Sequence, residues 1–206
     1  MGRFCEEKYM WRDIAKFGKK LTDSGLVGSQ FGNISLRNGD KMLITKTGVS
    51  LDEIKKNSVV ELDIGKPSNL DPIASSETLV HRTIYKNTPA LSIIHAHPFF
   101  SVIESMLVEN ETIVPINIEG EYFLHEIPVV KGATGSAGLA DKTAQALYTH
   151  KGVIVFGHGT FSAGKTLEEA YFVTALMEQS CKMKYYFDLA VGITQLPYGV
   201  IKPSSS

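Results

Sequence analysis

The stretch that decides the fold is residues 33–45, which read Asn-Ile-Ser-Leu-Arg-Asn-Gly-Asp-Lys-Met-Leu-Ile-Thr. Its centre, Asn38-Gly39-Asp40, is a tight-turn signal between two short runs that carry branched and other apolar residues. Two such runs joined by Asn-Gly are typical of a β-hairpin. We therefore expect strands over residues 33–37 and 41–45, and hence an antiparallel sheet.

Helical and strand patterns are mixed on both sides of this hairpin. Apolar spacing predicts an amphipathic helix over residues 6–24, which ends at Gly25, and a later helix that begins with a capping box at Thr166 and Glu169. Further strands are expected at residues 59–64, 91–97 and 151–156, and further helices from Ser75 or Ser76 to residue 86 and at residues 100–107, 140–149 and 166–186. We find neither a repeat nor a linker, so we expect one domain over residues 1–206, with an α/β architecture of a sheet layered with helices.

The overall composition favours a small-molecule partner. The 21 lysines and arginines almost balance the 22 aspartates and glutamates, so no broad field attracts nucleic acid or a membrane surface. Cys5 and Cys181 are the only cysteines and form no disulfide framework, so we expect reduced thiols and a structural role for Cys181. The first residues lack the apolar core of a signal peptide, and no apolar run is long enough to span a membrane. We therefore expect a cytoplasmic protein.

Three histidines form a candidate metal site. His95 and His97 are two residues apart on a predicted strand, so both imidazoles point to the same side of it. Taken alone, such a pair more often makes ordinary hydrogen bonds. His158 lies between Gly157 and Gly159, where the backbone can take an unusual turn and bring a third imidazole close. Three neutral imidazoles suit Zn²⁺ and leave a fourth position for a carboxylate, water or substrate.

A carboxylate and three small polar segments could complete this site. Glu77 lies at a predicted helix start, where it either complements the helix dipole or acts beside a metal as ligand and general base. Gly32-Asn33, Thr47-Gly48 and Ser75-Ser76 each offer backbone amides and small side chains that could hold an anion. The alternative for each is plain turn or cap chemistry. A phosphate site therefore requires the three segments to meet in space.

Taken in order, several motifs resemble the class II aldolase and adducin head family, most closely its L-fuculose-phosphate aldolase branch. The resemblance covers nearly the whole chain. The matching segments are Gly32-Asn-Ile-Ser-Leu-Arg37, Ile44-Thr-Lys-Thr-Gly48, Ala74-Ser-Ser-Glu77, His81, Ile94-His-Ala-His97 and Gly157-His-Gly159.

This resemblance implies a fold and a set of site residues. The implied fold is a three-layer α/β/α arrangement with a central, mostly antiparallel sheet, assembled as a ring of four with active sites between subunits. The implied roles are zinc ligation by His95, His97, His158 and, at rest, Glu77, which then acts as base. The implied phosphate-binding residues are Asn33, Thr47, Gly48, Ser75 and Ser76, with Gly32 shaping the first loop.

The resemblance also implies a reaction, the zinc-dependent reversible cleavage of a ketose 1-phosphate to dihydroxyacetone phosphate and a small aldehyde such as lactaldehyde. One departure concerns the proton donor, because the bacterial fuculose-phosphate aldolases carry a tyrosine where Ile127-Pro128 here leads to Lys131-Gly132. The candidates for this acid are Tyr122, His125, Lys131 and Tyr198. Methylthioribulose 1-phosphate dehydratases, pentulose 5-phosphate 4-epimerases and the non-catalytic adducin head share the scaffold and stand as alternative functions.

Overall fold

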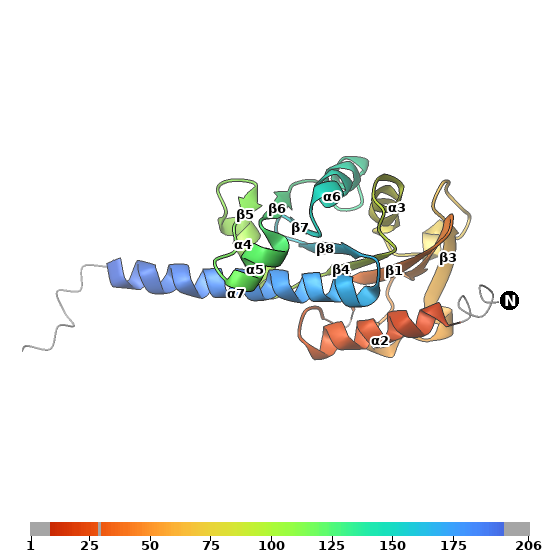
Figure 1. Ribbon diagram of the computed structural model, residues 1–206. Helices are drawn as coiled ribbons and strands as arrows, with labels where there is room; N and C mark the ends of the chain where they lie inside the picture. Colours follow the sequence, from red (N-terminus) through yellow and green to blue (C-terminus); the bar gives the residue numbers. More distant parts are fainter. Residues whose placement is uncertain (1–8, 29, 196–206) are drawn as a thin grey trace, which may run out of the picture.

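An eight-stranded sheet forms the centre of the molecule in the computed structural model, which describes residues 9–28 and 30–195 (Figure 1). The strand order is β3-β2-β1-β4-β8-β7-β6-β5. Neighbouring strands are antiparallel except for β6 and β7, which are parallel. The strands are β1 (Asn33–Asn38), β2 (Lys41–Thr45), β3 (Val59–Asp63), β4 (Ser92–Ala96), β5 (Thr112–Ile113), β6 (Ile127–Val130), β7 (Gly152–Val155) and β8 (Gly159–Gly164).

Helices cover both faces of this sheet, which confirms the predicted three-layer α/β/α architecture. In Figure 1, α3 and α6 lie above the sheet and α2 and α7 lie below it, while α4 and α5 pack beside α7. The α-helices are α2 (Met10–Asp23), α3 (Thr78–Asn87), α4 (Phe99–Leu107), α5 (Ile118–Leu124), α6 (Ala137–Thr149) and α7 (Leu167–Gln195). Short 3-10 turns form η1 (Leu51–Glu53), η2 (Lys56–Ser58) and η3 (Asp71–Ile73).

The central strand β4 shows why its sequence is apolar without alternation. Successive side chains of a strand point to opposite faces of the sheet. Ile93 packs into the core between the sheet and helices α3 and α6, whereas Ile94 packs into the core between the sheet and helices α2 and α7. Both side chains are fully buried, so both faces of β4 are interior.

Among the described helices, none is both long and apolar enough to cross a membrane.

The hairpin and the first helix largely follow the sequence prediction. Ser35 pairs with Ile44 in the β1–β2 ladder, and Gly39 in the connecting turn has a φ of +61°. The first helix ends as expected, since Gly25 takes a φ of +68° and its N–H donates to the carbonyl of Thr22. Its start differs: α2 begins at Met10, and residues 6–8 of the predicted helix lie outside the described part of the chain, as does Cys5.

Several predicted boundaries differ from the structure, among them α6, which begins at Ala137 rather than at residue 140, and three of the differences have a clear cause. Helix α3 begins at Thr78, because the backbone N–H of Thr78 donates to the carbonyl of Ser75 and closes a separate turn before the helix. Strand β4 ends at Ala96, whose partner Thr160 is the last pair of that ladder, so His97 lies one residue beyond the strand. Helix α7 continues to Gln195 rather than ending at residue 186, since no proline interrupts it.

The described cysteine has the structural role expected of it. Cys181 is fully buried on α7, among the apolar side chains that pack α7 against β7. Burial raises the pKa of its thiol to about 12, so the reactive thiolate is suppressed at neutral pH.

Candidate metal centre

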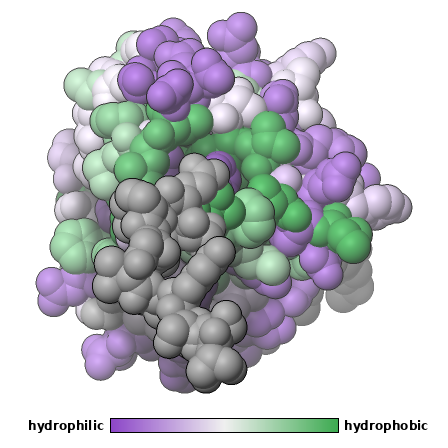
Figure 2. All heavy atoms as spheres, turned by 90° about the vertical axis from the view of Figure 1, so that its left-hand side faces the viewer, coloured by the Kyte–Doolittle hydropathy of each residue, from purple (hydrophilic) through white to green (hydrophobic). Residues whose placement is uncertain are grey.

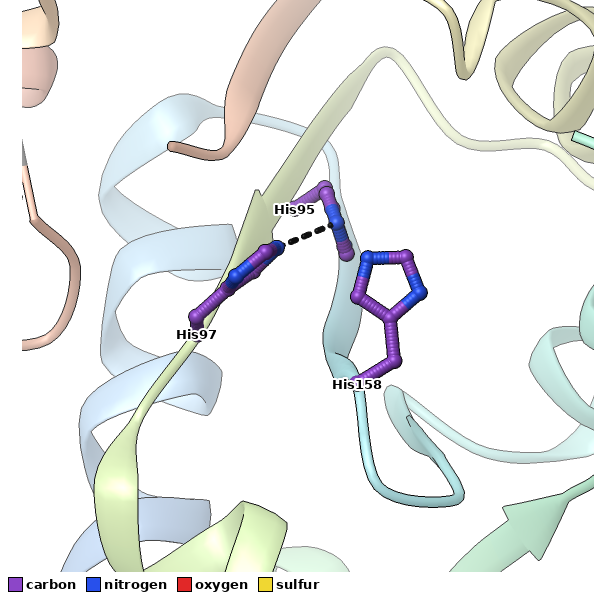
Figure 3. Close-up of side chains that lie close together, drawn as sticks. All are labelled: His95, His97 and His158. Carbon is purple, nitrogen blue, oxygen red and sulfur yellow. Dashed lines mark hydrogen bonds between the residues drawn. The ribbon is translucent and has the colours of Figure 1, made fainter. Parts of the chain in front are cut away.

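The three predicted histidines meet where β4 ends and β7 turns into β8. We call this end of the inner strands the edge. His95 lies near the end of β4, His97 follows this strand, and His158 occupies the turn between β7 and β8. One nitrogen from each ring belongs to a group whose members all lie within 4.8 Å of one another. Figure 3 shows the rings turned toward a common centre, with the Nε2 atoms of His95 and His97 at 3.0 Å. The sequence spacing therefore predicted a real cluster.

A hydrogen bond fixes the tautomer of His95. The ring is fully enclosed, stacks on Phe161 with centroids 4.2 Å apart, and has its Nδ1 2.9 Å from the carbonyl oxygen of Thr160. A carbonyl can only accept, so Nδ1 carries the proton and donates it. The Nε2 atom of His95 is left with its lone pair directed at the cluster, as a metal ligand requires.

All three imidazoles are neutral near pH 7. Burial lowers the pKa of His97 to about 4, with a further contribution from the neighbouring His158. Burial also lowers the pKa of His158, and it lowers the pKa of His95 well below the ordinary value. Metals bind the neutral form of imidazole, so none of these rings has to lose a net proton.

The two glycines beside His158 have different functions. Gly157 has a φ of +64° and makes the turn, which is the conformational role the sequence suggested. Gly159 is needed for close approach: a Cβ there would lie 2.4 Å from the carbonyl oxygen of Ala96 and 2.8 Å from Cδ2 of His97. Only glycine lets β8 lie this close to the histidine rings.

One nitrogen–nitrogen distance in the cluster can be compared with that of a zinc site. Two nitrogens that bind one zinc ion at about 2.0–2.1 Å in tetrahedral geometry lie roughly 3.3 Å apart. The 3.0 Å separation of the His95 and His97 nitrogens is close to this value. Three imidazoles also leave one position of the tetrahedron for another ligand. The three histidines could therefore hold a metal ion.

Glu77 is a buried carboxylate without a described partner. Its side chain is 2% exposed, neither carboxylate oxygen accepts a hydrogen bond from any described residue, and burial raises its pKa. Glu77 occupies the N-cap position of α3, but its side chain makes no capping hydrogen bond. It also lies outside the 4.8 Å group of histidines. A buried carboxylate is costly unless a cation or proton satisfies it, so its isolation fits a role toward a cation.

Backbone hydrogen bonds bring the predicted anion-binding segments together. The N–H of Thr47 donates to the carbonyl of Ile73, and the N–H of Ser75 donates to the carbonyl of Thr45. Asn33 joins the same edge, since it pairs with His95 in the β1–β4 ladder. Gly32 and Gly48 turn the chain beside these residues with φ values of +78° and +70°. Ser76 lies in the same loop as Ser75, next to Gly135.

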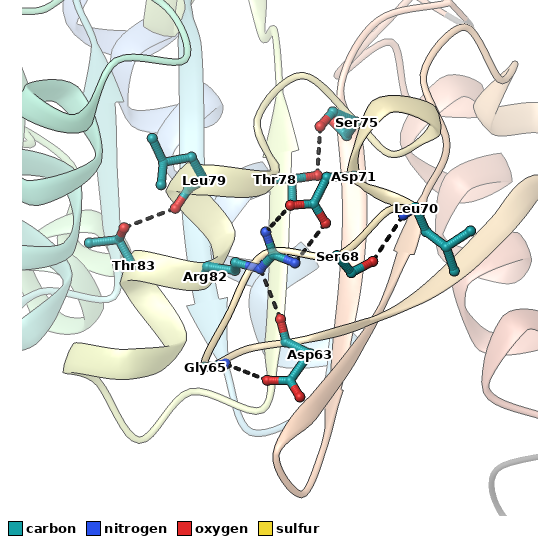
Figure 4. A network of polar contacts seen from close by, with 10 residues as sticks. All are labelled: Asp63, Gly65, Ser68, Leu70, Asp71, Ser75, Thr78, Leu79, Arg82 and Thr83. Carbon is teal, nitrogen blue, oxygen red and sulfur yellow. Dashed lines mark hydrogen bonds and ion pairs between the residues drawn. The ribbon is translucent and has the colours of Figure 1, made fainter.

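An ion pair that sequence reasoning missed anchors this loop (Figure 4). The guanidinium of Arg82 donates to both carboxylate oxygens of Asp71, at 2.6 and 2.8 Å, and also to the carbonyl of Asp63 at 2.9 Å. Arg82 is buried, and its hydrogen bonds hold the pKa of Asp71 below the ordinary 3.8. The pair ties η3 to α3 just before Ser75. No local pattern links a loop aspartate to a helix arginine.

The structure separates the candidate proton donors. Lys131 follows β6, and since β6 is parallel to β7, it lies at the same end of the sheet as His158. Its ammonium lies 4.8 Å from the centroid of the Phe156 ring. His125 precedes β6 and so lies toward the other end, and Tyr122 is 71% exposed on α5. Tyr198 lies outside the described residues. Among the described candidates, Lys131 is the one placed toward its own chain's cluster.

Comparison with known proteins gives a consistent result. The model of the family described as "Class II Aldolase and Adducin N-terminal domain" matches residues 12–185. An L-fuculose phosphate aldolase of Methanocaldococcus jannaschii is 32% identical over 180 residues, which cover 84% of this chain and 93% of that protein.

Two further relatives are similar. A 5-methylthioribulose-1-phosphate/5-deoxyribulose-1-phosphate aldolase of Escherichia coli is 30% identical over 166 residues, which cover 78% of this chain and 76% of that protein. The crystal structure of L-fuculose-1-phosphate aldolase from Thermus thermophilus superposes with a TM-score of 0.84 at 30% identity, covering 90% of this chain and 97% of that one.

Proposed function

Since this chain belongs to the class II aldolase and adducin family, we propose that it is a zinc-dependent aldolase acting on a ketose 1-phosphate of the L-fuculose 1-phosphate type. The products are dihydroxyacetone phosphate and a small aldehyde such as lactaldehyde. Its class as an aldolase, a carbon–carbon lyase, follows from the family and its relatives. The observation that carries the rest is the convergence of three neutral imidazoles within 4.8 Å.

The residues of the metal centre have two roles, which are metal binding and proton transfer. His95, His97 and His158 would hold the zinc, which when bound would supply a Lewis acid for the oxygens of the ketone substrate. Glu77, although outside the histidine group in this structure, would be a ligand at rest and then the general base that removes the proton beside the carbonyl. Its burial supports this role, because burial raises its pKa and so makes the carboxylate a stronger base.

The substrate phosphate is held at the edge where the anion-binding segments meet. The amide of Asn33 and the backbone and hydroxyl groups of Thr47, Gly48, Ser75 and Ser76 supply the donors, and Gly32 shapes the first loop. The hydrogen bonds between residues 45–47 and 73–75 support this assignment, since they place two of the segments side by side. The Asp71–Arg82 pair keeps that loop in place from outside the site. Holding the phosphate fixes the ketone half of the substrate against the metal.

We propose further that the enzyme is a homotetramer with active sites between subunits. Figure 2 shows apolar surface gathered on the side of the molecule from which α7 projects. Exposed apolar side chains on one region of a protein surface mark interaction sites. The exposed apolar side chains of the helices α4, α5 and α7 include Phe99 and Leu107 of α4, Ile118 and Tyr122 of α5, and Met183, Tyr186, Phe187 and Leu189 of α7. A neighbouring copy of the chain on this surface would bury them.

The test is a cleavage assay on the zinc-loaded protein. L-Fuculose 1-phosphate, and 5-deoxyribulose 1-phosphate because of the Escherichia coli relative, are offered separately, and dihydroxyacetone phosphate is detected with a coupled dehydrogenase. We expect release from at least one of them and its loss on addition of chelator. A Gly138→Ala variant, altered at an uncrowded position of α6, should behave as wild type.

Other outcomes would assign the alternative functions. Dehydration of methylthioribulose 1-phosphate without any cleavage would make the protein a dehydratase. Epimerisation of a pentulose 5-phosphate would make it a 4-epimerase. A folded protein that binds no metal and transforms none of these compounds would be a non-catalytic domain of the adducin type.

A further inference from the structure

A chain of four buried side chains leads from α3 to the edge that carries the metal centre. The Tyr85 hydroxyl is 2.7 Å from Oγ of Ser35, and this Oγ is 2.7 Å from Nδ1 of His81. The Nε2 of His81 is 2.6 Å from Oδ1 of Asn33. All four residues are at most 5% exposed. Of these four residues, the proposed mechanism uses only Asn33, as a donor to the phosphate.

The direction of these hydrogen bonds follows from the Tyr85 end. Among the described residues, Ser35 is the only hydrogen-bond partner of the Tyr85 hydroxyl, which must therefore donate to Oγ of Ser35. The Ser35 hydroxyl hydrogen has no other acceptor among the described residues, so Ser35 donates to Nδ1 of His81, and the proton of the neutral ring lies on Nε2. The reverse direction would leave the buried Tyr85 hydroxyl without an acceptor, which is costly. Burial lowers the pKa of His81 to about 3, so the ring is neutral.

This direction decides how the amide of Asn33 is presented. The Nε2–H of His81 donates to Oδ1 of Asn33, so the carbonyl end of the amide faces inward. The N–H₂ group is the other end, and it has no hydrogen-bond partner among the described residues. Asn33 stands opposite His95 in the β1–β4 ladder, at the edge where the anion-binding segments meet. If the amide were turned the other way, its oxygen would face the phosphate, and the two negatively polarised groups would repel each other.

We propose that the Tyr85–Ser35–His81 chain locks the Asn33 amide with its N–H₂ group toward the substrate phosphate, which makes His81 a positioning residue for phosphate binding. This inference rests on the proposed function, since it deepens the phosphate site. His81 does not touch the substrate. Its effect is confined to the phosphate, so it should alter substrate binding and leave the chemical step unchanged.

The test compares two substitutions of His81 in the full-length, zinc-loaded protein. His81→Phe removes the donor to Asn33, whereas His81→Gln keeps an N–H₂ group near the position of Nε2. Inorganic phosphate is titrated while the side-chain amide signals of Asn33 are followed by NMR. We expect phosphate to bind on the order of tenfold more weakly to His81→Phe, and within about threefold of wild type to His81→Gln, as for the loss and rescue of one hydrogen bond. With the ketose phosphate, His81→Phe should raise KM and leave kcat unchanged.

A second measurement covers the case in which His81→Phe does not fold. Long-range proton–nitrogen correlation in the wild-type protein should show His81 protonated on Nε2. Ser35→Ala should allow the other tautomer to appear, because no hydroxyl then donates to Nδ1 of His81. Protonation of wild-type His81 on Nδ1, or a folded His81→Phe variant that binds phosphate as wild type does, would overturn the inference.

The readouts separate this inference from the proposed function. If wild-type protein binds phosphate through Asn33 in a His81-dependent way but cleaves no ketose phosphate, the aldolase proposal fails and the positioning role stands. If the enzyme cleaves its substrate and His81→Phe changes neither KM nor phosphate binding, the positioning role fails and the aldolase proposal stands.

Discussion

Replacing Gly159 by alanine would place a methyl group inside the metal centre. The added Cβ would lie 2.4 Å from the carbonyl oxygen of Ala96, roughly 0.9 Å short of the ~3.3 Å at which carbon–oxygen contacts begin. Both sides are held by strand pairing, since Ala96 pairs with Thr160 and Gly159 with Val155. Relief therefore requires one strand to move. We expect the free energy of unfolding to fall by about 1–3 kcal/mol, the usual cost of overpacking.

The same substitution should weaken metal binding. The new Cβ would also lie 2.8 Å from Cδ2 of His97 and 3.2 Å from Cε1 of His95, so at least one ligand ring must be displaced. We expect zinc affinity to fall on the order of tenfold to a hundredfold, as when the support of a metal ligand is disturbed. Gly138→Ala is the matched control, since a Cβ at that position meets nothing within 4 Å.

The assays are urea unfolding of the metal-free proteins and competition for zinc with a chromogenic chelator. Gly138→Ala should match wild type in both. A Gly159→Ala variant with wild-type unfolding free energy and wild-type zinc affinity would refute the packing account of the site.

Three other predictions follow from the site and its surroundings. Glu77→Gln should lose most turnover, because an amide cannot accept the proton, and near-native turnover would exclude Glu77 as the base. The metal-free variant should nevertheless be more stable to urea than wild type, since a buried unpartnered carboxylate is removed. Asp71→Asn should lower the unfolding free energy at pH 7 by about 1–3 kcal/mol, because Arg82 loses its partner. Arg82 lowers the pKa of Asp71, so the pair stabilises the fold above pH 3.8, and this contribution is lost as the pH falls below that value. The urea curves of wild type and Asp71→Asn should therefore converge in acid. Equal stability of the two proteins at pH 7 would show that the Asp71–Arg82 ion pair does not stabilise the fold. Light scattering at micromolar concentration should give the mass of four chains, and a monomer would rule out sites between subunits.

The parts of the fold that local chemistry determines were predictable. The Asn38-Gly39 turn specified the β1–β2 hairpin, and the capping box at Thr166 specified the start of α7, where the N–H of Glu169 donates to the Thr166 hydroxyl at 3.2 Å. The His-x-His spacing predicted that the two imidazoles would lie together, and they do, although His97 lies one residue beyond β4. In each case the interacting residues are close in sequence, so the pattern contains the interaction.

The parts that depend on distant partners were missed. Strand β8 reads Gly-Thr-Phe-Ser-Ala-Gly, with little apolar character, and was not predicted. Its hydroxyl groups are buried because distant residues satisfy them: the Thr174 hydroxyl of α7 donates to Oγ of Ser162 at 2.9 Å. The short elements β5, β6 and α5 were likewise absent from the prediction, since each is too brief for its periodicity to be resolved.

The site shows the same division. The sequence identified the histidines and Glu77, but it could not show that Glu77 is buried without a partner or that Arg82 holds Asp71. Nor could it show why His81 matters, because the hydrogen bonds to Ser35 and Asn33 cross 46 and 48 residues of chain. These features arise only when α3 packs against the sheet.

The most direct test of the central claim is the metal content of the purified protein, measured by elemental analysis in wild type and in the single variants His95→Ala, His97→Ala and His158→Ala. We expect about one zinc per wild-type chain and reduced occupancy in each variant, because three imidazoles converge on one ion. Full zinc occupancy in all three variants, or wild-type protein that binds no metal when zinc is supplied, would contradict it.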